Sequence, residues 1–240
     1  MKAMKQQNIV AILAGGSGQR VGGEIPKQLV DMAGKTLLER TVEVFERHPR
    51  IDRILVVSHP DYIGQVEAIR AKHPCGKWQL TVAGGAERQW STVAAVEACP
   101  QEGNLLIHDA ARPFVPAALI DRLLDALESH AAAVPAVPVN DTLIETDNDT
   151  VKCVPDRRKF RFVQTPQAFH LDLFHQAIAQ LKSCKNLCFT DDCGLFRHFF
   201  PEENIAVVEG DMGNKKLTYL SDIEDFRKIF QQNDKNKLQE

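Results

Sequence analysis

The stretch NIVAILAGGSGQRVGGEIPKQL, residues 8–29, joins an apolar run to a glycine-rich loop that also carries two basic residues. The continuous apolar run Ile9–Leu13 predicts a strand covered on both faces, because a half-exposed strand would alternate apolar with polar residues. In the loop, Arg20 and Lys27 supply positive charge, and Pro26 disfavours a helix at the residue before it. Ligands of open α/β sheets bind beyond the carboxyl ends of the strands. The stretch therefore predicts an α/β fold with an anion-binding loop at the exit of its first strand.

Strand and helix patterns alternate outward from this stretch. Further strands are predicted at residues 53–57, 79–83, 105–108, 132–139, 160–163 and 205–208. Helices are predicted at residues 36–46, 58–73, 89–98, 116–130, 171–182, 191–199 and 221–232, and Ser58 is expected to cap the second of them. This β-α-β order predicts a Rossmann-like α/β sandwich, with a mostly parallel, twisted sheet and helices on both faces. The length of 240 residues fits a single domain over residues 1–240.

Composition limits the class of protein. Charged residues make up 25% and hydrophobic residues 44%, as in soluble globular proteins. The net charge of −3 gives no global basic field, so we expect no nucleic-acid partner. No apolar run is long enough to span a membrane, and the first residues lack the pattern of a signal peptide. With six cysteines and no C-x-x-C pair, we expect a cytoplasmic protein with reduced thiols.

Cys184, Cys188 and Cys193, followed by His198, raise the alternative of a zinc site. Structural zinc sites usually contain more closely paired cysteines than this C-x3-C-x4-C spacing. Free cysteine is also among the residue types that are most often buried in protein cores. The spacing favours buried thiols and leaves zinc as the alternative.

The glycine-rich loop has three possible ligand-binding interpretations. A Walker-type loop requires G-x4-G-K-[ST], which this sequence lacks. The dinucleotide fingerprint G-x-G-x-x-G almost fits from Gly16, but Val21 stands where the third glycine belongs. The third interpretation is a loop that wraps a nucleoside triphosphate, with Arg20 and Lys27 as its own cations. A solvated turn without a ligand is the remaining alternative, and the two cations favour the triphosphate loop.

Other polar groups are expected at the same edge of the sheet. Asp109 directly follows a predicted strand in the segment HDAARP, where it can hold Mg2+ or cap a helix. Arg112 offers a planar fork to a second phosphate. A second glycine turn, Gly84–Gly85, precedes a helix in which Ser91 can bond a base or a sugar. Arg88 in this segment serves either as a ligand or as a structural ion-pair partner.

The alternation breaks where residues 142–146 and 151–154 flank the turn sequence DNDT. This pattern predicts a β-hairpin arm over residues 140–156. The arm is either a surface feature without a partner or an extension that contacts another subunit.

Several segments together resemble one enzyme family. AGGSGQR followed by PKQ resembles the signature loop of nucleotidyltransferases that couple a sugar or polyol phosphate to a nucleoside triphosphate. The later segments are GGAERQWSTV (84–93), HDAARPFV (108–115), DRRKFRFVQTPQAF (156–169), FTDD (189–192) and GNKKLT (213–218). From about Ile9 to Phe226, the chain is similar to the 2-C-methyl-D-erythritol 4-phosphate cytidylyltransferase family. The resemblance implies a nucleotidyltransferase fold, CTP as a substrate, Mg2+ and release of pyrophosphate.

The resemblance also implies roles for individual residues. The cations that stabilise the triphosphate and the leaving pyrophosphate are Arg20, Lys27 and Lys216, with Lys215 as the rival of Lys216. The nucleotide contacts are Ala14, Gly15, Gly16, Gly18, Gly84, Gly85, Ser91 and Ala110. The acceptor contacts are Asp109, Arg112, Thr142, Arg157, Thr165 and Thr190, and Asp109 is also the metal ligand. In the family, the equivalents of Thr142 and Arg157 reach a partner's active site, which implies a homodimer.

The identity of the acceptor has two interpretations. The loop residues Ala14-Gly15-Gly16 and Val21 depart from the family's usual sequence, and the Ala14-Gly15-Gly16 loop resembles that of relatives that make CDP-ribitol from ribitol 5-phosphate. Ala111 instead matches the enzymes that use methylerythritol 4-phosphate. Our leading hypothesis is the methylerythritol phosphate enzyme, and transfer to ribitol 5-phosphate or another polyol phosphate is the alternative. A catalytically silent nucleotide-binding protein is the alternative of another class.

Overall fold

One mixed sheet forms the centre of the protein, whose computed structural model describes residues 6–16, 25–73, 76–184 and 186–237. The strands lie in the order β10-β5-β9-β4-β1-β2-β3, and β8 pairs with β5. Their bounds are β1 Asn8–Ala14, β2 Arg53–Ser58, β3 Trp78–Ala83, β4 Asn104–Asp109, β5 Ala132–Pro138, β8 Arg161–Val163, β9 Gln167–His170 and β10 Ile205–Glu209. All pairs are parallel except those of β8 and β9. The predicted mostly parallel sheet is confirmed, and β9 is a strand that the sequence patterns did not indicate.

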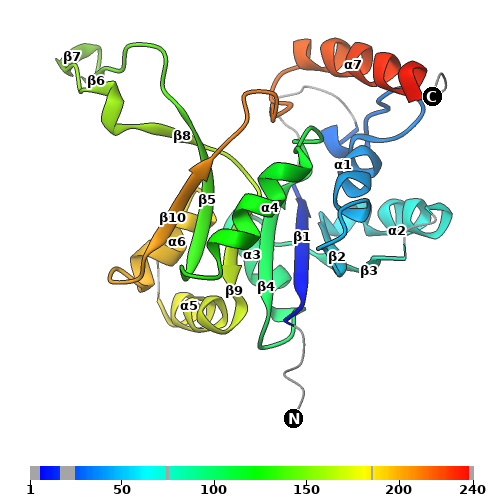
Figure 1. Cartoon of the computed structure of the whole chain (residues 1–240), viewed down its shortest axis with the longest axis horizontal. Helices are drawn as coiled ribbons and strands as arrows, with labels where there is room; N and C mark the ends of the chain where they lie inside the picture. Colours follow the sequence, from blue (N-terminus) through cyan, green and yellow to red (C-terminus); the bar gives the residue numbers. More distant parts are fainter. Residues whose placement is uncertain (1–5, 17–24, 74–75, 185, 238–240) are drawn as a thin grey trace.

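Helices cover both faces of the sheet, as predicted (Figure 1). They are α1 Leu37–Glu46, α2 Ile63–Lys72, α3 Arg88–Glu97, α4 Ala117–Ala126, α5 Leu171–Ser183, α6 Asp192–Phe199 and α7 Ser221–Lys237. One core contains side chains of α1, α2 and α4, and the other contains those of α3, α5 and α6. In β1, Val10 and Ile12 face the first core while Ile9 and Ala11 face the second. Burial on both faces is the reason why this strand is continuously apolar.

The start of α2 corrects the sequence prediction. Ser58 was expected to cap a helix over residues 58–73, but it is the last residue of β2 and is 1% exposed. Pro60 instead opens a short 3-10 turn, Pro60–Tyr62, and the α-helix begins at Ile63. The pairing of Ser58 with Ala14 in β1 extends the strand through the predicted cap.

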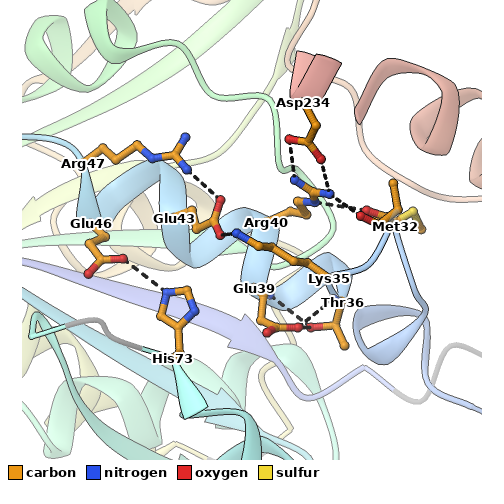
Figure 2. Close-up of polar contacts among 11 residues, drawn as sticks. Met32, Lys35, Thr36, Glu39, Arg40, Glu43, Glu46, Arg47, His73 and Asp234 are labelled. Atoms are coloured by element: carbon orange, nitrogen blue, oxygen red, sulfur yellow. Dashed lines mark hydrogen bonds and ion pairs between the residues drawn. The ribbon is translucent and has the colours of Figure 1, made fainter. Parts of the chain in front are cut away.

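A third apolar cluster docks α7 onto the body of the protein. Its buried members are Met32, Leu37, Ala111, Leu217, Ile223, Phe226 and Phe230. Figure 2 shows that Arg40 of α1 donates hydrogen bonds to both carboxylate oxygens of Asp234 in α7 and to the backbone oxygen of Met32. This bidentate ion pair of Arg40 and Asp234 stabilises α7 beyond its predicted end at residue 232.

The hairpin arm consists of β6, Glu145–Asp147, and β7, Thr150–Cys153. These strands form a separate two-stranded sheet, which stands away from the main sheet in Figure 1. They extend further into the DNDT sequence than predicted, because Asp147 pairs with Thr150 and only Asn148 and Asp149 form the turn. Over the described part of the chain, no helix combines the length and the apolar character needed to cross a bilayer.

Candidate active site

A cavity of about 350 Å³ opens at the carboxyl ends of β1, β2 and β4. The sheet register pairs Leu13 with Asp109 and Ala14 with Ser58, so the exits of these strands lie side by side. The predicted site residues that line the cavity are Ala14, Gly15, Gly16, Lys27, Gly85, Ser91, Asp109, Ala110 and Lys216. The fold thus brings together residues from segments that are far apart in the sequence. Gly18 and Arg20 lie outside the described residues.

Gly15 and Gly84 allow two backbone segments to close around Ser91. A Cβ atom on Gly84 would lie 2.6 Å from Ser91 Oγ, and a Cβ atom on Gly15 would lie 3.0 Å from the same oxygen. These distances are shorter than ordinary contacts, so glycine leaves room for the serine hydroxyl. The wall of the cavity is therefore backbone at this end, which suits hydrogen bonding to a flat polar ligand.

Gln28 organises the exit of β1, a role that the sequence analysis did not assign. Its side chain is 3% exposed, and its Nε2 donates to the backbone oxygens of Ala14 at 2.6 Å and Gly16 at 3.2 Å. A peptide unit is planar and trans, so turning the Ala14 oxygen toward Gln28 points the N–H of Gly15 the opposite way. The only signal in the sequence was the position of Gln28 next to Lys27. His59 and Glu87 also line the cavity, and the sequence assigned neither of them a role.

Two lysines reach the cavity from distant parts of the chain. The Nζ atom of Lys27 lies 3.3 Å from the backbone oxygen of Leu217, and Nζ of Lys216 lies 2.6 Å from Asp109 Oδ2. Lys215 is exposed and is not among the described residues that line the cavity. The geometry therefore favours Lys216 over Lys215 as the cation of this segment.

Arg88 binds two carboxylates at the cavity wall. Its Nη2 lies 2.7 Å from Asp192 Oδ2, and its Nε lies 3.4 Å from Asp109 Oδ1. Asp192 is 1% exposed and also accepts a hydrogen bond from Thr92 Oγ1 at 2.7 Å. Burial opposes the charged form of Asp109, but Arg88 and Lys216 outweigh burial and hold the pKa of this carboxyl well below its ordinary value. Arg88 is therefore an ion-pair partner that keeps an anion at the cavity.

Buried polar side chains hold the turn that follows β4. The backbone N–H of Arg112 donates to Asp109 O at 3.0 Å, and α4 begins only after Pro116, so Asp109 is not a helix cap. Arg112 Nη1 donates to the backbone oxygen of Asn214 at 2.8 Å, while its Nε is buried without a hydrogen-bond partner among the described residues. Thr165 Oγ1 accepts the backbone N–H of Asp109 at 3.1 Å. Arg112 is thus a largely buried guanidinium that ties this turn to the segment of Asn214.

Five of the six predicted acceptor residues are absent from the described cavity lining. Arg112 lies in the turn that follows β4, Thr165 bonds to that turn, and the other three are exposed elsewhere. Thr142 is exposed at the base of the arm. Arg157, also exposed, donates a hydrogen bond to the backbone oxygen of Asn140. Thr190 is exposed and precedes Asp191, which caps α6. Thr142 and Arg157 are therefore not brought to the cavity of their own chain.

The cysteines carry no sign of a metal centre. Among the described residues, no group of three or more His, Cys, Asp or Glu side chains is arranged to hold a metal ion. The expectation of buried thiols is wrong for Cys184 and Cys188, which are exposed free thiols because they lie in the connection between α5 and α6. Cys193 is half-buried, and burial raises its pKa to about 11. The zinc alternative for these cysteines thus has no support in the described part of the chain.

Comparisons with known proteins show which proteins this chain resembles. The family model for 2-C-methyl-D-erythritol 4-phosphate cytidylyltransferase matches residues 8–232. The chain is 37% identical to the enzyme of that name from Thermobifida fusca, over 89% of either chain. It is 36% identical to a bifunctional ribulose 5-phosphate reductase/CDP-ribitol pyrophosphorylase from Haemophilus influenzae, over 95% of this chain but only 49% of that protein. The solved structure of 4-diphosphocytidyl-2C-methyl-D-erythritol synthase from Anaerococcus prevotii matches with a TM-score of 0.82 and 28% identity, over 94% of this chain and 96% of that chain.

Proposed function

Because this chain belongs to the 2-C-methyl-D-erythritol 4-phosphate cytidylyltransferase family, we propose that it joins CTP to 2-C-methyl-D-erythritol 4-phosphate. The products are 4-diphosphocytidyl-2-C-methyl-D-erythritol and pyrophosphate, so the protein is a nucleotidyltransferase of isoprenoid precursor synthesis by the methylerythritol phosphate pathway. The observation that carries this conclusion is the family match over residues 8–232, which includes the strand exits and every described residue of the cavity.

The reaction is a displacement at the α-phosphorus of CTP. A phosphate oxygen of the acceptor forms a bond to this phosphorus, the bond to the bridging oxygen of the β-phosphate breaks, and pyrophosphate leaves. The acceptor phosphate is already an anion near neutral pH, so the reaction needs no general base. The protein must position two polyanions and offset their mutual repulsion, which is the task of preorganised cations.

Lys27, Lys216 and Arg20 are the cations that we assign to this task. Lys27 and Arg20 would hold the triphosphate and stabilise the leaving pyrophosphate, and Lys216 would contact the α-phosphate. The support for Lys27 and Lys216 is their position in the lining of the same cavity, where Lys27 Nζ lies 3.3 Å from the backbone oxygen of Leu217, the neighbour of Lys216. The assignment of Arg20 rests on the sequence resemblance, since this residue lies outside the described part of the chain.

Backbone groups are assigned to the nucleoside. The glycine-rich exits of β1 and β3, together with the Ser91 hydroxyl, would bond the base and the ribose. The proposed contacts are Ala14, Gly15, Gly16, Gly18, Gly84, Gly85, Ser91 and Ala110. The close packing of Gly15 and Gly84 on Ser91 supports this assignment, because it leaves backbone polar groups at the surface of the cavity.

Asp109 fits the role of a Mg2+ ligand. Its carboxylate is ionised, 13% exposed and placed at the edge of the cavity. No cage of three carboxylates surrounds it among the described residues, and Mg2+ in nucleotide sites commonly uses one or two carboxylates plus the phosphates. Bound there, Mg2+ would neutralise phosphate charge. The contribution of this chain is an anionic oxygen, which Arg88 holds in place.

The acceptor site is proposed to lie between two copies of the chain. Arg112, Thr165 and Thr190 would contribute from one copy, and Thr142 and Arg157 from the arm of the second. The support is the location of the last two residues outside their own cavity, together with apolar side chains exposed on the arm, such as Val151 at 59%. We place this homodimer in the cytoplasm, in keeping with its free cysteines.

Ribitol 5-phosphate is the second candidate acceptor, because of the similarity to the Haemophilus influenzae protein with CDP-ribitol pyrophosphorylase in its name. In the sequence, Ala111 favours methylerythritol 4-phosphate over ribitol 5-phosphate as the acceptor. In the structure, Ala111 is 4% exposed and belongs to the apolar cluster of Met32 and Leu217. Ala111 also lines the cavity, so a larger residue at position 111 would occupy space beside the substrates and press on the segment that carries Lys216.

The test is pyrophosphate release from CTP and Mg2+, with methylerythritol 4-phosphate and ribitol 5-phosphate compared at equal concentrations. We expect rapid release with the first acceptor and little with the second. Rapid release with ribitol 5-phosphate alone would reassign the acceptor. Silence with both, from protein that still binds CTP, would support the catalytically silent binding protein instead.

A further inference from the structure

We propose that His108 is a positioning residue for the acceptor side of the site and acts by fixing the turn from Asp109 to Arg112. The inference rests on the proposed function, in which Asp109 holds Mg2+ and Arg112 and Thr165 contact the acceptor. His108 is 0% exposed and is absent from the described lining of the cavity, so it acts without touching a substrate. The sequence pattern assigns roles to its neighbours in HDAARP but none to the histidine itself.

The two ring nitrogens of His108 contact the two ends of this turn. Nε2 lies 2.9 Å from the backbone oxygen of Arg112. Nδ1 lies 3.0 Å from Thr165 Oγ1, which in turn accepts the backbone N–H of Asp109 at 3.1 Å. One imidazole is therefore bonded directly to the end of the turn and, through one hydroxyl, to its beginning.

The direction of each hydrogen bond follows from the chemistry of the partners. A backbone carbonyl can only accept, so Nε2 carries the hydrogen that bonds Arg112. Thr165 Oγ1 already accepts the backbone N–H of Asp109, so its own hydrogen is available to Nδ1, which accepts it. The hydroxyl hydrogen of Thr165 then points to Nδ1, and its oxygen accepts from Asp109. The chain of bonds has one consistent arrangement.

A second set of bonds ties this network to the Lys216 segment. The Nδ2 atom of Asn214 donates to the backbone oxygen of Thr165 at 2.9 Å, and the backbone oxygen of Asn214 accepts from Arg112 Nη1 at 2.8 Å. Asn214 is 0% exposed. Phe45 packs edge-on against the His108 ring at 4.9 Å between centroids, which holds the plane of the ring. His108 thus contacts both Arg112 and Thr165, the two residues beside it that we assign to the acceptor.

The test compares His108→Phe with a matched control, His170→Phe. His170 also bonds a backbone carbonyl through Nε2, at 2.9 Å to Leu127. It pairs with Asn104, at the opposite end of β4 from the cavity. Each variant loses one hydrogen bond to a backbone carbonyl and keeps a planar ring. We expect both to lower the melting temperature, but only His108→Phe to lower kcat/KM for the acceptor, by about 100-fold. The KM for CTP should stay within about twofold.

Two conservative variants separate positioning from simple packing. Glutamine at position 108 can place a donor near the site of Nε2, and asparagine can place an acceptor near that of Nδ1. We expect His108→Gln and His108→Asn each to recover part of the acceptor kcat/KM that phenylalanine loses. A phenylalanine variant with unchanged acceptor kcat/KM would overturn the proposal. If that variant does not fold, unchanged acceptor kcat/KM in both amide variants would overturn it equally.

One further variant keeps this test independent of the proposed function. Arg112→Gln removes a group that we assign directly to the acceptor, so it should raise the acceptor KM by itself. If Arg112→Gln has no such effect, the assignment of the acceptor site is wrong. If Arg112→Gln weakens acceptor use and the His108 variants do not, the acceptor site stands and the positioning role of His108 is wrong.

Discussion

Replacing Arg88 by methionine should destabilise the fold strongly, because it leaves the carboxylate of Asp192 buried without a cation. Asp192 is 1% exposed, and Arg88 Nη2 at 2.7 Å is its ion-pair partner. After the substitution, the hydrogen bond from Thr92 Oγ1 remains at one carboxylate oxygen. Asp109 loses much less, because Lys216 still lies 2.6 Å from it. The cost therefore arises mainly at Asp192.

The magnitude follows from the burial of this pair. Removing one partner of a buried ion pair costs about 3–5 kcal/mol of unfolding free energy. For a domain of this size, each kcal/mol lowers the melting temperature by about 2–4 °C, so we expect Arg88→Met to lower it by about 6–20 °C. The methionine keeps most of the aliphatic stem, which limits the loss of packing.

The assay is calorimetric unfolding at neutral pH of Arg88→Met and of the double variant Arg88→Met/Asp192→Asn. The asparagine removes the buried charge and keeps an oxygen that accepts from Thr92, so the double variant should regain at least half of the lost stability. A loss below about 1 kcal/mol in the single variant would refute the reasoning. A double variant no more stable than the single one would show that lost packing, rather than an unpaired charge, is the cause.

Three further predictions concern the cavity and its surroundings. Lys27→Met should lower kcat by about 1,000-fold with the fold intact, since its charge acts mainly in the transition state, whereas Lys215→Met should stay within about twofold in the same pyrophosphate-release assay. Gly84→Ala should cost about 1–3 kcal/mol in urea unfolding and raise the KM for CTP, because its Cβ would lie 2.6 Å from Ser91 Oγ; Gly64→Ala, where nothing lies within 4 Å of the added Cβ, should lose no stability. Burial lowers the pKa of His108 from 6.5 to about 4, so the unfolded chain binds a proton there that the native protein does not. Stability should therefore fall as the pH drops from about 6.5 toward 4, by up to about 3 kcal/mol, and His108→Phe should lose this part of the pH dependence.

The arrangement of the sheet could be predicted because its signal is local. The apolar run of β1 is continuous, and successive residues of this strand enter the two cores on either face. The order of elements then fixed the parallel strands and the helices on both faces. The exit of β1 followed from glycine and proline, whose backbone preferences do not depend on distant partners.

The features that the sequence did not predict share a different physical origin. The strand β9 is only four residues long, QAFH, and exists because it fits antiparallel between β4 and β5. Ser58 has the chemistry of a helix cap, but pairing with Ala14 keeps it in a strand. The ion pair of Arg88 and Asp192 joins residues that are 104 positions apart, and no local pattern reveals such a partner. These features depend on tertiary contacts, which override local preferences.

The candidate site was predicted best where a segment carries both its backbone signal and its charge, as around Lys27. It was predicted least well for the groups that hold the charges in place. Gln28 donates to two backbone oxygens of the β1 exit, a role that its place in the PKQ segment does not reveal. His108 lay inside a recognised motif, yet its two bonds link it to Arg112 and Thr165. Such roles become visible only when both partners are placed in space.

The position of Lys216 depends on packing outside the two cores of the sheet. Its neighbour Leu217 is 0% exposed, and the Leu217 N–H donates to the backbone oxygen of Ala111 at 2.9 Å. Leu217 and Ala111 share one apolar cluster with Phe226 of α7. The same helix packs on the HDAARPFV segment through Phe114, whose ring lies 4.8 Å from that of Phe226. Since α7 contacts both the segment that carries Lys216 and the segment that carries Asp109, substitutions in its apolar face should change catalysis without any contact to a substrate.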